Sequence, residues 1–317
     1  MDRSVLFLKI KESVFGAPIR KLIADWPGYQ NIPEPFSIDV MRSRVRACLS
    51  LLSQILTHSE MSKERLGKLK KLKASQSGNI LLIGNGPSAS SLTLSQINRF
   101  RKFGGKVAVM NRYYKSMLAS QIEPDYYFIT DPEHWNPVSY STLNLKAELI
   151  EYFANVTSDC CLVQPAQNPD LIASHRNYLY IDGRSAQGLW RGKSPVRPWG
   201  LPASVAMIAI STLQYLGYKR IYFSGLDSNF LSFFEVDSLN KVVNPGVGQH
   251  FYKADADQED LQKPIDENHK LPYRNMADLH FAHGIFLRDL RFLVGDSCIN
   301  VGGDKSNDVS PRACLLG

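Results

Sequence analysis

The stretch NILLIGNGPS, residues 79–88, decides the fold that we expect for this chain. Its apolar run at 79–84 is typical of a strand buried on both faces of a parallel sheet. In the turn that follows, GNGPS at 84–88, glycines let the backbone bend tightly and approach a ligand. A helix opening near Ser90 would aim unpaired N–H groups at this turn, which predicts an anion site. The turn is neither the Gly-x-Gly-x-x-Gly dinucleotide motif nor a P-loop, and such turns also serve merely to connect a strand to a helix.

The rest of the core alternates strand and helix patterns. Apolar runs predict further strands at 106–110, 126–130, 161–164, 178–181, 220–224 and 298–301, and helical periodicity predicts helices at 92–103, 114–121, 142–154, 202–216 and 276–293. This alternation is typical of βαβ units with right-handed crossovers. We therefore predict an α/β fold, a Rossmann-like doubly wound, mostly parallel sheet with helices on both faces. A helical N-terminal extension at 1–77 precedes this domain at 78–317, in which the polar stretch at about 228–272 is expected to be a lid loop.

The composition is that of an ordinary globular protein, with 44% hydrophobic and 21% charged residues. No apolar run approaches the roughly 18 residues that span a bilayer, and the first residues do not resemble a signal peptide, so we expect a cytoplasmic location. Five scattered cysteines without a CxxC pair argue against a disulfide framework and a zinc site. The net charge of +7 favours an anionic partner. Much of this charge lies at 63–73, which is either a solvated helix face or a peripheral contact with anionic lipid at the inner face of the membrane.

Polar residues follow four of the predicted strands. Besides the 84–88 turn, Asn111 and Arg112 follow the second strand, Asp131 follows the third, and Ser-Gly-Leu-Asp at 224–227 ends the strand at 220–224. Because the carboxyl ends of parallel strands meet at one edge of the sheet, where open α/β sheets bind ligands, we expect one site there. Each of these groups taken alone is also explained as a turn former or a helix cap.

Four segments, ILLIGNGPSASSL, VMNRYY, FITDP and LPASVAMIAISTLQYLGYKRIYFSGLD, follow one another along the chain. In this order they resemble the bacterial lipooligosaccharide sialyltransferases and related bacterial surface-polysaccharide proteins with the same Rossmann-like core. The resemblance covers residues 79–230 and the terminal helix and strand, whereas residues 1–76 have no counterpart in it. It implies a glycosyltransferase that moves an acidic sugar, of the sialic acid or Kdo type, from a CMP-sugar donor to a bacterial surface glycan or glycolipid acceptor.

The resemblance also implies where the donor nucleotide binds. The contacts would come from the GNGPS turn, the end of the second strand, the start of the helix at 202–216, and the end of the 220–224 strand. The implied donor-nucleotide residues are Gly84, Asn85, Gly86, Pro87, Ser88, Asn111, Arg112, Ser204, Gly225, Asp227 and Tyr252. Tyr252 is the nearest substitute for the tyrosines that the family places soon after the SGxD strand to hold the leaving phosphate.

Two residues, His250 and Asp131, are predicted to be catalytic. Transfer needs a base for the acceptor hydroxyl, and an imidazole suits this task near neutral pH. His250 follows a glycine-rich turn in the lid, with His269 and His134 as alternatives. Asp131 stands where the family has an asparagine beside the donor sugar, so a covalent intermediate on its carboxylate, with net retention, is a second mechanism. We expect no cofactor and no metal requirement, because no Asp-x-Asp follows a core strand.

Two rival functions stay open at this point. A hydroxymethylpterin diphosphokinase-like enzyme would use Asp131, Glu133 and Asp227 to hold Mg²⁺. A non-catalytic nucleotide-binding subunit of a polysaccharide assembly complex would dock through residues 1–76. Nucleic-acid binding has the least support, because the basic residues are not interleaved with stacking aromatic residues.

Overall fold

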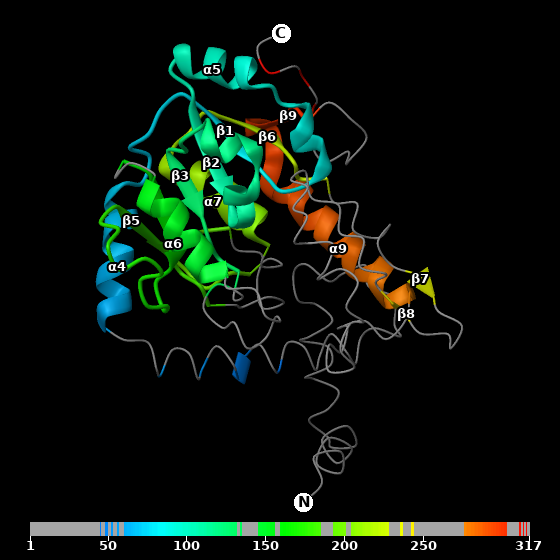
Figure 1. Cartoon of the computed structure of the whole chain (residues 1–317). Helices are drawn as coiled ribbons and strands as arrows, with labels where there is room; N and C mark the ends of the chain where they lie inside the picture. The colour runs from blue at the N-terminus through cyan, green and yellow to red at the C-terminus, as the bar shows by residue number, and fades with distance from the viewer. Residues whose placement is uncertain are drawn as a thin grey trace, which may run out of the picture.

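The computed structural model describes the core of the chain and parts of its periphery. Figure 1 shows helices arranged around a central sheet, with the described N-terminal positions below it. The described residues are 45, 48, 49, 52, 56, 60–131, 134, 145–155, 159–184, 193–200, 204–227, 235–236, 242–243, 276–302, 311, 313 and 315.

A seven-stranded parallel sheet forms the centre of the protein, with the strand order β5-β4-β3-β2-β1-β6-β9. Every neighbouring pair in this sheet is parallel. These strands are covered on both faces, which explains why they are continuous apolar runs in the sequence. The predicted α/β fold is confirmed. The strands are β1 (Asn79–Ile83), β2 (Lys106–Met110), β3 (Tyr126–Phe128), β4 (Cys161–Pro165), β5 (Tyr178–Ile181), β6 (Arg220–Ser224) and β9 (Cys298–Asn300).

Helices cover both faces of the sheet (Figure 1). Alternate residues of β1 point to opposite faces, as the two-residue period of a strand requires. Leu82 packs into the core shared with α4, α7 and α9, whereas Leu81 packs into the core shared with α5 and α6. The sheet is therefore doubly wound. The helices are α4 (Glu60–Lys71), α5 (Leu94–Lys102), α6 (Leu145–Asn155), α7 (Val205–Leu216) and α9 (Met276–Val294).

The strand order reverses beside β1. From β1 the chain winds outward through β2, β3, β4 and β5, and α7 then returns it to the other side of β1, where β6 forms. In register, Ile83 at the end of β1 pairs with Val109 of β2 and with Ser224 of β6. Open α/β sheets bind ligands beyond the carboxyl ends of their strands at such a switch point. The GNGPS turn and the segment after Ser224 flank this point.

Three local predictions differ from the structure. The predicted helix at 114–121 is instead a pair of 3₁₀ helices, η3 (Asn111–Lys115) and η4 (Met117–Ser120). Ser116 between them is extended, with φ −84° and ψ 152°, and the neighbouring Tyr113 is fully buried, so tertiary packing overrides the helical pattern. The helix expected to open near Ser90 begins instead at Leu94, as α5, and the 3₁₀ helix η2 (Pro87–Ser91) precedes it.

The third difference lies in the stretch predicted as a lid loop. Part of it forms an antiparallel strand pair, β7 (Glu235–Val236) with β8 (Val242–Val243). The remainder of 228–272 lies outside the described residues.

Helix α4 was assigned by its sequence to the N-terminal extension, yet it packs on the sheet domain. Leu69 is fully buried in the core. Arg65 Nη1 donates to the carbonyl of Asn168 at 2.7 Å, and Lys68 Nζ donates to the carbonyl of Tyr178 at 2.8 Å. Two members of the basic run thus fasten the helix to the domain.

Candidate functional site

The GNGPS turn is fastened to the end of β6 by hydrogen bonds. Gly84 N–H donates to the carbonyl of Ser224 at 2.8 Å, and Gly86 N–H donates to that of Gly225 at 2.9 Å. Ser88 Oγ accepts from Gly225 N–H at 2.9 Å. Gly225 has a φ of +75°, and a β-carbon on it would lie 2.5 Å from the carbonyl oxygen of Gly84. Both its conformation and its surroundings therefore require glycine.

The Asp227 carboxylate occupies the position in which an anion would bind to this turn. Ser88 N–H donates to Asp227 Oδ2 at 2.7 Å, and Asp227 is buried. Pro87 has no N–H to offer. The amides of Gly84, Gly86 and Ser88 are thus all engaged within the protein, and the carboxylate beside them repels a phosphate. The anion site expected from the turn alone has no free amide among these three.

Asn111, directly after β2, has a backbone conformation that few residues adopt. Its φ of +46° lies in the left-handed region, which asparagine tolerates better than most residues. Its carbonyl accepts from the Tyr127 hydroxyl at 2.6 Å, and the hydroxyl oxygen of Tyr127 in turn accepts from Tyr114 N–H at 3.1 Å. Burial holds the pKa of Tyr127 well above its usual range, so this phenol stays protonated and donates. Tyr127 thus fixes the backbone of Asn111.

Three side-chain oxygens at this edge are buried and have no hydrogen-bond partner among the described residues. They are Asn85 Oδ1, Asn111 Oδ1 and Asp227 Oδ1. Asn85 and Asn111 each lie two residues beyond the paired residues Ile83 and Val109, and Asp227 follows the adjacent strand β6. Buried polar groups are normally hydrogen-bonded, so each exception calls for an explanation. A ligand seated at the switch point would supply the donors for all three.

Ser204 and Asp131 occupy other positions at the carboxyl edge. Ser204 is the N-cap of α7, and its Oγ accepts from Met207 N–H at 3.2 Å. Asp131 follows β3, and the buried His134 folds back on it. His134 N–H donates to the carbonyl of Asp131 at 3.2 Å, and His134 Nδ1 lies 3.3 Å from the same oxygen. The structure therefore brings the imidazole of His134 to the backbone carbonyl of Asp131, just beyond the end of β3.

The predicted site residues thus fall into two groups. His250 and Tyr252, with the alternatives Glu133 and His269, lie outside the described residues. The described members follow the carboxyl ends of the strands or begin the helix α7; they are Gly84, Asn85, Gly86, Pro87, Ser88, Asn111, Arg112, Asp131, Ser204, Gly225 and Asp227.

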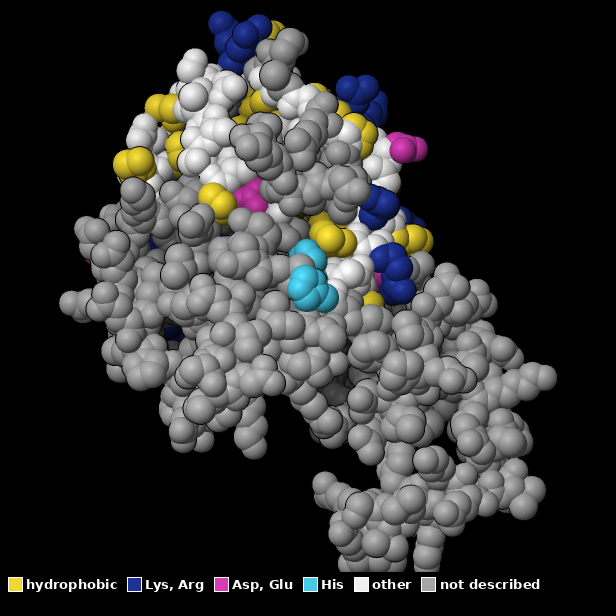
Figure 2. Space-filling view, turned by 90° about the vertical axis from the view of Figure 1, so that its right-hand side faces the viewer, with side chains coloured by type: hydrophobic (Ala, Val, Ile, Leu, Met, Phe, Trp, Pro, Cys, Tyr) yellow, Lys and Arg dark blue, Asp and Glu magenta, His cyan; other side chains and the backbone are white. Residues whose placement is uncertain are grey.

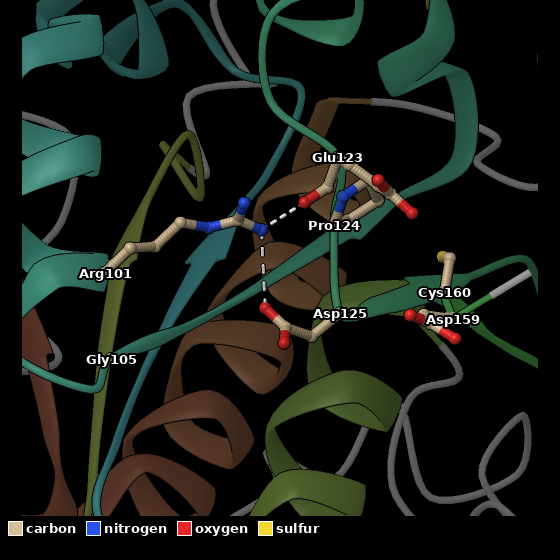
Figure 3. Close-up of a pocket in the computed structure, with 7 residues that line it drawn as sticks. All are labelled: Arg101, Gly105, Glu123, Pro124, Asp125, Asp159 and Cys160. Carbon is tan, nitrogen blue, oxygen red and sulfur yellow. Dashed lines mark hydrogen bonds and ion pairs between the residues drawn. The ribbon is translucent and has the colours of Figure 1, made fainter. Parts of the chain in front are cut away.

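A cavity of about 340 Å³ lies at the opposite edge of the sheet, where the strands begin (Figure 3). Arg101 Nη2 lies 3.4 Å from Asp125 Oδ2, and Asp125 also accepts from Val107 N–H at 2.8 Å. Burial raises the pKa of the Cys160 thiol, the reverse of what activates a cysteine nucleophile. These groups hold the starts of β2, β3 and β4 in place, so we assign them a structural role. The lining residues are Arg101, Gly105, Glu123, Pro124, Asp125, Asp159 and Cys160.

Sequence reasoning missed Gly302, which lies against the GNGPS turn. A β-carbon on Gly302 would lie 2.6 Å from Ser88 Oγ and 3.0 Å from Ser224 Oγ. The segment that follows β9 therefore packs closely against the turn, on the side of β6. The Gly-Gly pair after the predicted strand at 298–301 was the available signal. The role of Tyr127 left no comparable signal, because a tyrosine inside a buried strand reads simply as core.

Helix α9 carries two histidines, His280 and His283. His283 is buried and stacks on Phe286 with ring centroids 6.3 Å apart. Burial, and then the neighbouring His280, lower the pKa of His283. Figure 2 shows described histidine side chains at the surface, near hydrophobic side chains, on a face where basic groups are spread and acidic groups are sparse.

No protein-family model, no curated protein and no solved structure matches the chain. In the part of the chain that the structure describes, no helix combines the length and apolarity needed to cross a membrane. The same part contains no group of three or more His, Cys, Asp or Glu side chains that could hold a metal ion.

Proposed function

We propose that the protein is a glycosyltransferase that uses a CMP-activated acidic sugar. The observation that carries this proposal is the set of buried, unpartnered oxygens of Asn85, Asn111 and Asp227 around the switch point. The ribose hydroxyls and the cytosine amino group of CMP are hydrogen-bond donors, which suit such a set of acceptors. The nucleoside would lie across the ends of β1, β2 and β6.

The phosphate is expected to lie away from Asp227. The charge of this carboxylate and the engaged amide of Ser88 both disfavour a phosphate over the turn. Helix α7 begins at the carboxyl edge, because it leads from β5 back to the start of the parallel strand β6. Its N-terminus, capped by Ser204, offers unpaired amides and the positive end of the helix dipole. We therefore assign the phosphate to the start of α7.

In the transfer step, the acceptor hydroxyl bonds to the anomeric carbon, the bond from that carbon to the CMP phosphate breaks, and a base takes the hydroxyl proton. His250 is the proposed base of an inverting reaction, and His134 beside Asp131 is the alternative. In a retaining reaction, the Asp131 carboxylate would attack the anomeric carbon first and the acceptor would then displace it. The acceptor is a glycan or a glycolipid.

A thermal-shift screen with CMP, CDP, UDP, GDP and ATP tests the nucleotide. A ligand that binds only the native state raises the free energy of unfolding by about 2.7 kcal/mol at a hundredfold excess over Kd. We expect CMP to give the largest shift, and Asn85→Ala and Asn111→Gly to lose most of it. Glycine is chosen at 111 because it accepts the positive φ. Asn155→Ala, at an exposed position of α6, is the matched control.

Two outcomes would contradict the nucleotide proposal. One is a purine nucleotide that stabilises the protein as much as CMP does. The other is a CMP shift that survives in both site variants.

The catalytic roles are tested by turnover of a CMP-sugar with and without EDTA. Loss of a general base typically costs about 10²–10⁴-fold, so His250→Ala should keep the CMP shift while transfer collapses. If Asp131 is the nucleophile, Asp131→Ala is the more severe loss and intact mass spectrometry of the wild type detects a sugar adduct. Activity within a few-fold of wild type in both variants would leave neither residue a chemical role. Magnesium-dependent diphosphate transfer from ATP to a pterin would favour the kinase instead.

A further inference from the structure

Apolar side chains upstream of α4 are exposed in a regular pattern. Val45, Leu49, Leu52 and Leu56 are helical and are 41%, 63%, 57% and 86% exposed. Their spacing of four, three and four residues places them along one side of a helix. In Figure 1 the described positions of this region lie below the sheet, apart from the layered core. We call these four side chains the apolar stripe.

The charge around the apolar stripe is predominantly positive, since residues 41–71 contain eight Lys or Arg and two Glu. Residues 41–59 contain three arginines and neither Asp nor Glu. Helix α4 follows, and its Lys70 and Lys71 are exposed. By contrast, Arg65 and Lys68 are engaged with the sheet domain through hydrogen bonds. Lys70 and Lys71 therefore remain at the surface on the C-terminal side of the stripe, and the sequence places three arginines at 41–59 beside it.

We propose that the apolar stripe docks the protein on an anionic membrane surface. The leucines would enter the boundary between headgroups and acyl chains, while the basic side chains contact the anionic headgroups. This docking is independent of the nucleotide site, because it uses none of the residues at the carboxyl edge of the sheet.

A second copy of the chain is the competing occupant, and two observations disfavour it. A coiled coil is indicated by apolar heptads sustained over about three or four repeats, whereas the stripe spans only 45–56. The net charge around the stripe is positive, so two copies placed side by side would repel each other, while an anionic surface attracts both. Charge complementarity therefore selects the membrane.

Vesicle co-sedimentation of the full chain tests the proposal. The wild type should bind vesicles of phosphatidylcholine mixed with phosphatidylglycerol at least about tenfold more strongly than vesicles of phosphatidylcholine alone. The double variant Leu52→Glu/Leu56→Glu should lose about tenfold or more of this binding. Lys70→Glu/Lys71→Glu should weaken it by a similar factor, and added salt should weaken the wild type.

Matched controls separate the stripe from general surface apolarity. Phe103 and Met117 are also apolar and are 70% and 86% exposed, but they lie elsewhere on the domain, so Phe103→Glu and Met117→Glu should bind like wild type. Equal binding by wild type and Leu52→Glu/Leu56→Glu would overturn the proposal, as would failure of the wild type to bind the anionic vesicles. A dimer in sedimentation velocity that Leu52→Glu/Leu56→Glu dissociates, without vesicle binding by either protein, would assign the stripe to a second copy.

Discussion

Among single residues, Gly86 shows how closely the ends of β1 and β6 approach each other. Its backbone is extended, with φ −73° and ψ 160°, so its need for glycine is steric rather than conformational. A β-carbon there would lie 2.3 Å from Asp227 Oδ2 and 2.8 Å from the carbonyl oxygen of Gly225. The missing side chain is therefore what allows the Asp227 carboxylate to reach the amide of Ser88.

Gly86→Ala is expected to destabilise the protein by about 1–3 kcal/mol, because the added methyl group overpacks against a backbone carbonyl and a buried carboxylate. Urea unfolding measures this loss. If Asp227 takes part in CMP binding, the CMP-induced thermal shift should shrink as well.

Gly284→Ala provides the matched control. Gly284 lies within α9, and a β-carbon on it would meet no atom within 4 Å. The same substitution should therefore stabilise the helix by about 0.5–1 kcal/mol. Equal unfolding midpoints for the two variants would show that the close approach at Gly86 does not exist.

Among the elements, those buried in a parallel sheet are the ones that the sequence predicts well. The predicted strands at 106–110, 178–181 and 220–224 have the same bounds as β2, β5 and β6, because an uninterrupted apolar run has few other structures open to it. The helix predicted at 114–121 was wrong, because a short amphipathic pattern leaves several structures open. Its pattern fits a helix locally, while the burial of Tyr113 that decides its path depends on distant parts of the chain.

The grouping of Asn85, Asn111 and Asp227 at one edge was predictable, because parallel strands end on the same side. The hydrogen bond between Ser88 and Asp227 was not, since it joins residues 139 positions apart. Pattern alone gives the edge on which a residue lies, whereas the pairing of side chains and amides requires the spatial register of two segments.

Helix α5 begins with a capping box whose contribution can be measured. Thr93 Oγ1 accepts from Gln96 N–H at 3.3 Å, and Thr93 N–H donates to Gln96 Oε1 at 2.9 Å. Thr93→Ala should cost about 0.5–2 kcal/mol, since it leaves an amide of the first turn without its partner. Thermal and urea unfolding measure the loss. Thr93→Asp keeps an acceptor at the cap and should stay close to wild type; an equal loss in both variants would argue against the cap.

For the molecule as a whole, burial raises the pKa of several thiol and phenol groups and so keeps them protonated. Burial raises the pKa of the Cys161 and Cys298 thiols from 9.0 to about 11 and that of the Tyr178 hydroxyl from 10.0 to about 12. In the unfolded chain these groups ionise at their lower, ordinary values. Above pH 9 the native state therefore binds more protons than the unfolded state, so the free energy of unfolding falls as the pH rises. Their contribution is complete below pH 9 and is lost progressively above it.

The variant Cys298→Ala isolates the contribution of one thiol to this loss of stability at alkaline pH. At neutral pH the variant should be less stable than wild type, because removing the sulfur of a fully buried side chain leaves a small cavity. Between pH 9 and pH 11 the wild type loses the contribution of the protonated thiol and the variant does not, so the gap should narrow by about 2–3 kcal/mol. Urea unfolding of both proteins under reducing conditions measures the gap at each pH. Cys48→Ala, at an exposed helical position, should follow the wild type throughout. A gap that stays constant across this window would mean that the Cys298 thiol ionises alike in the folded and unfolded chains, which its position inside the core does not permit.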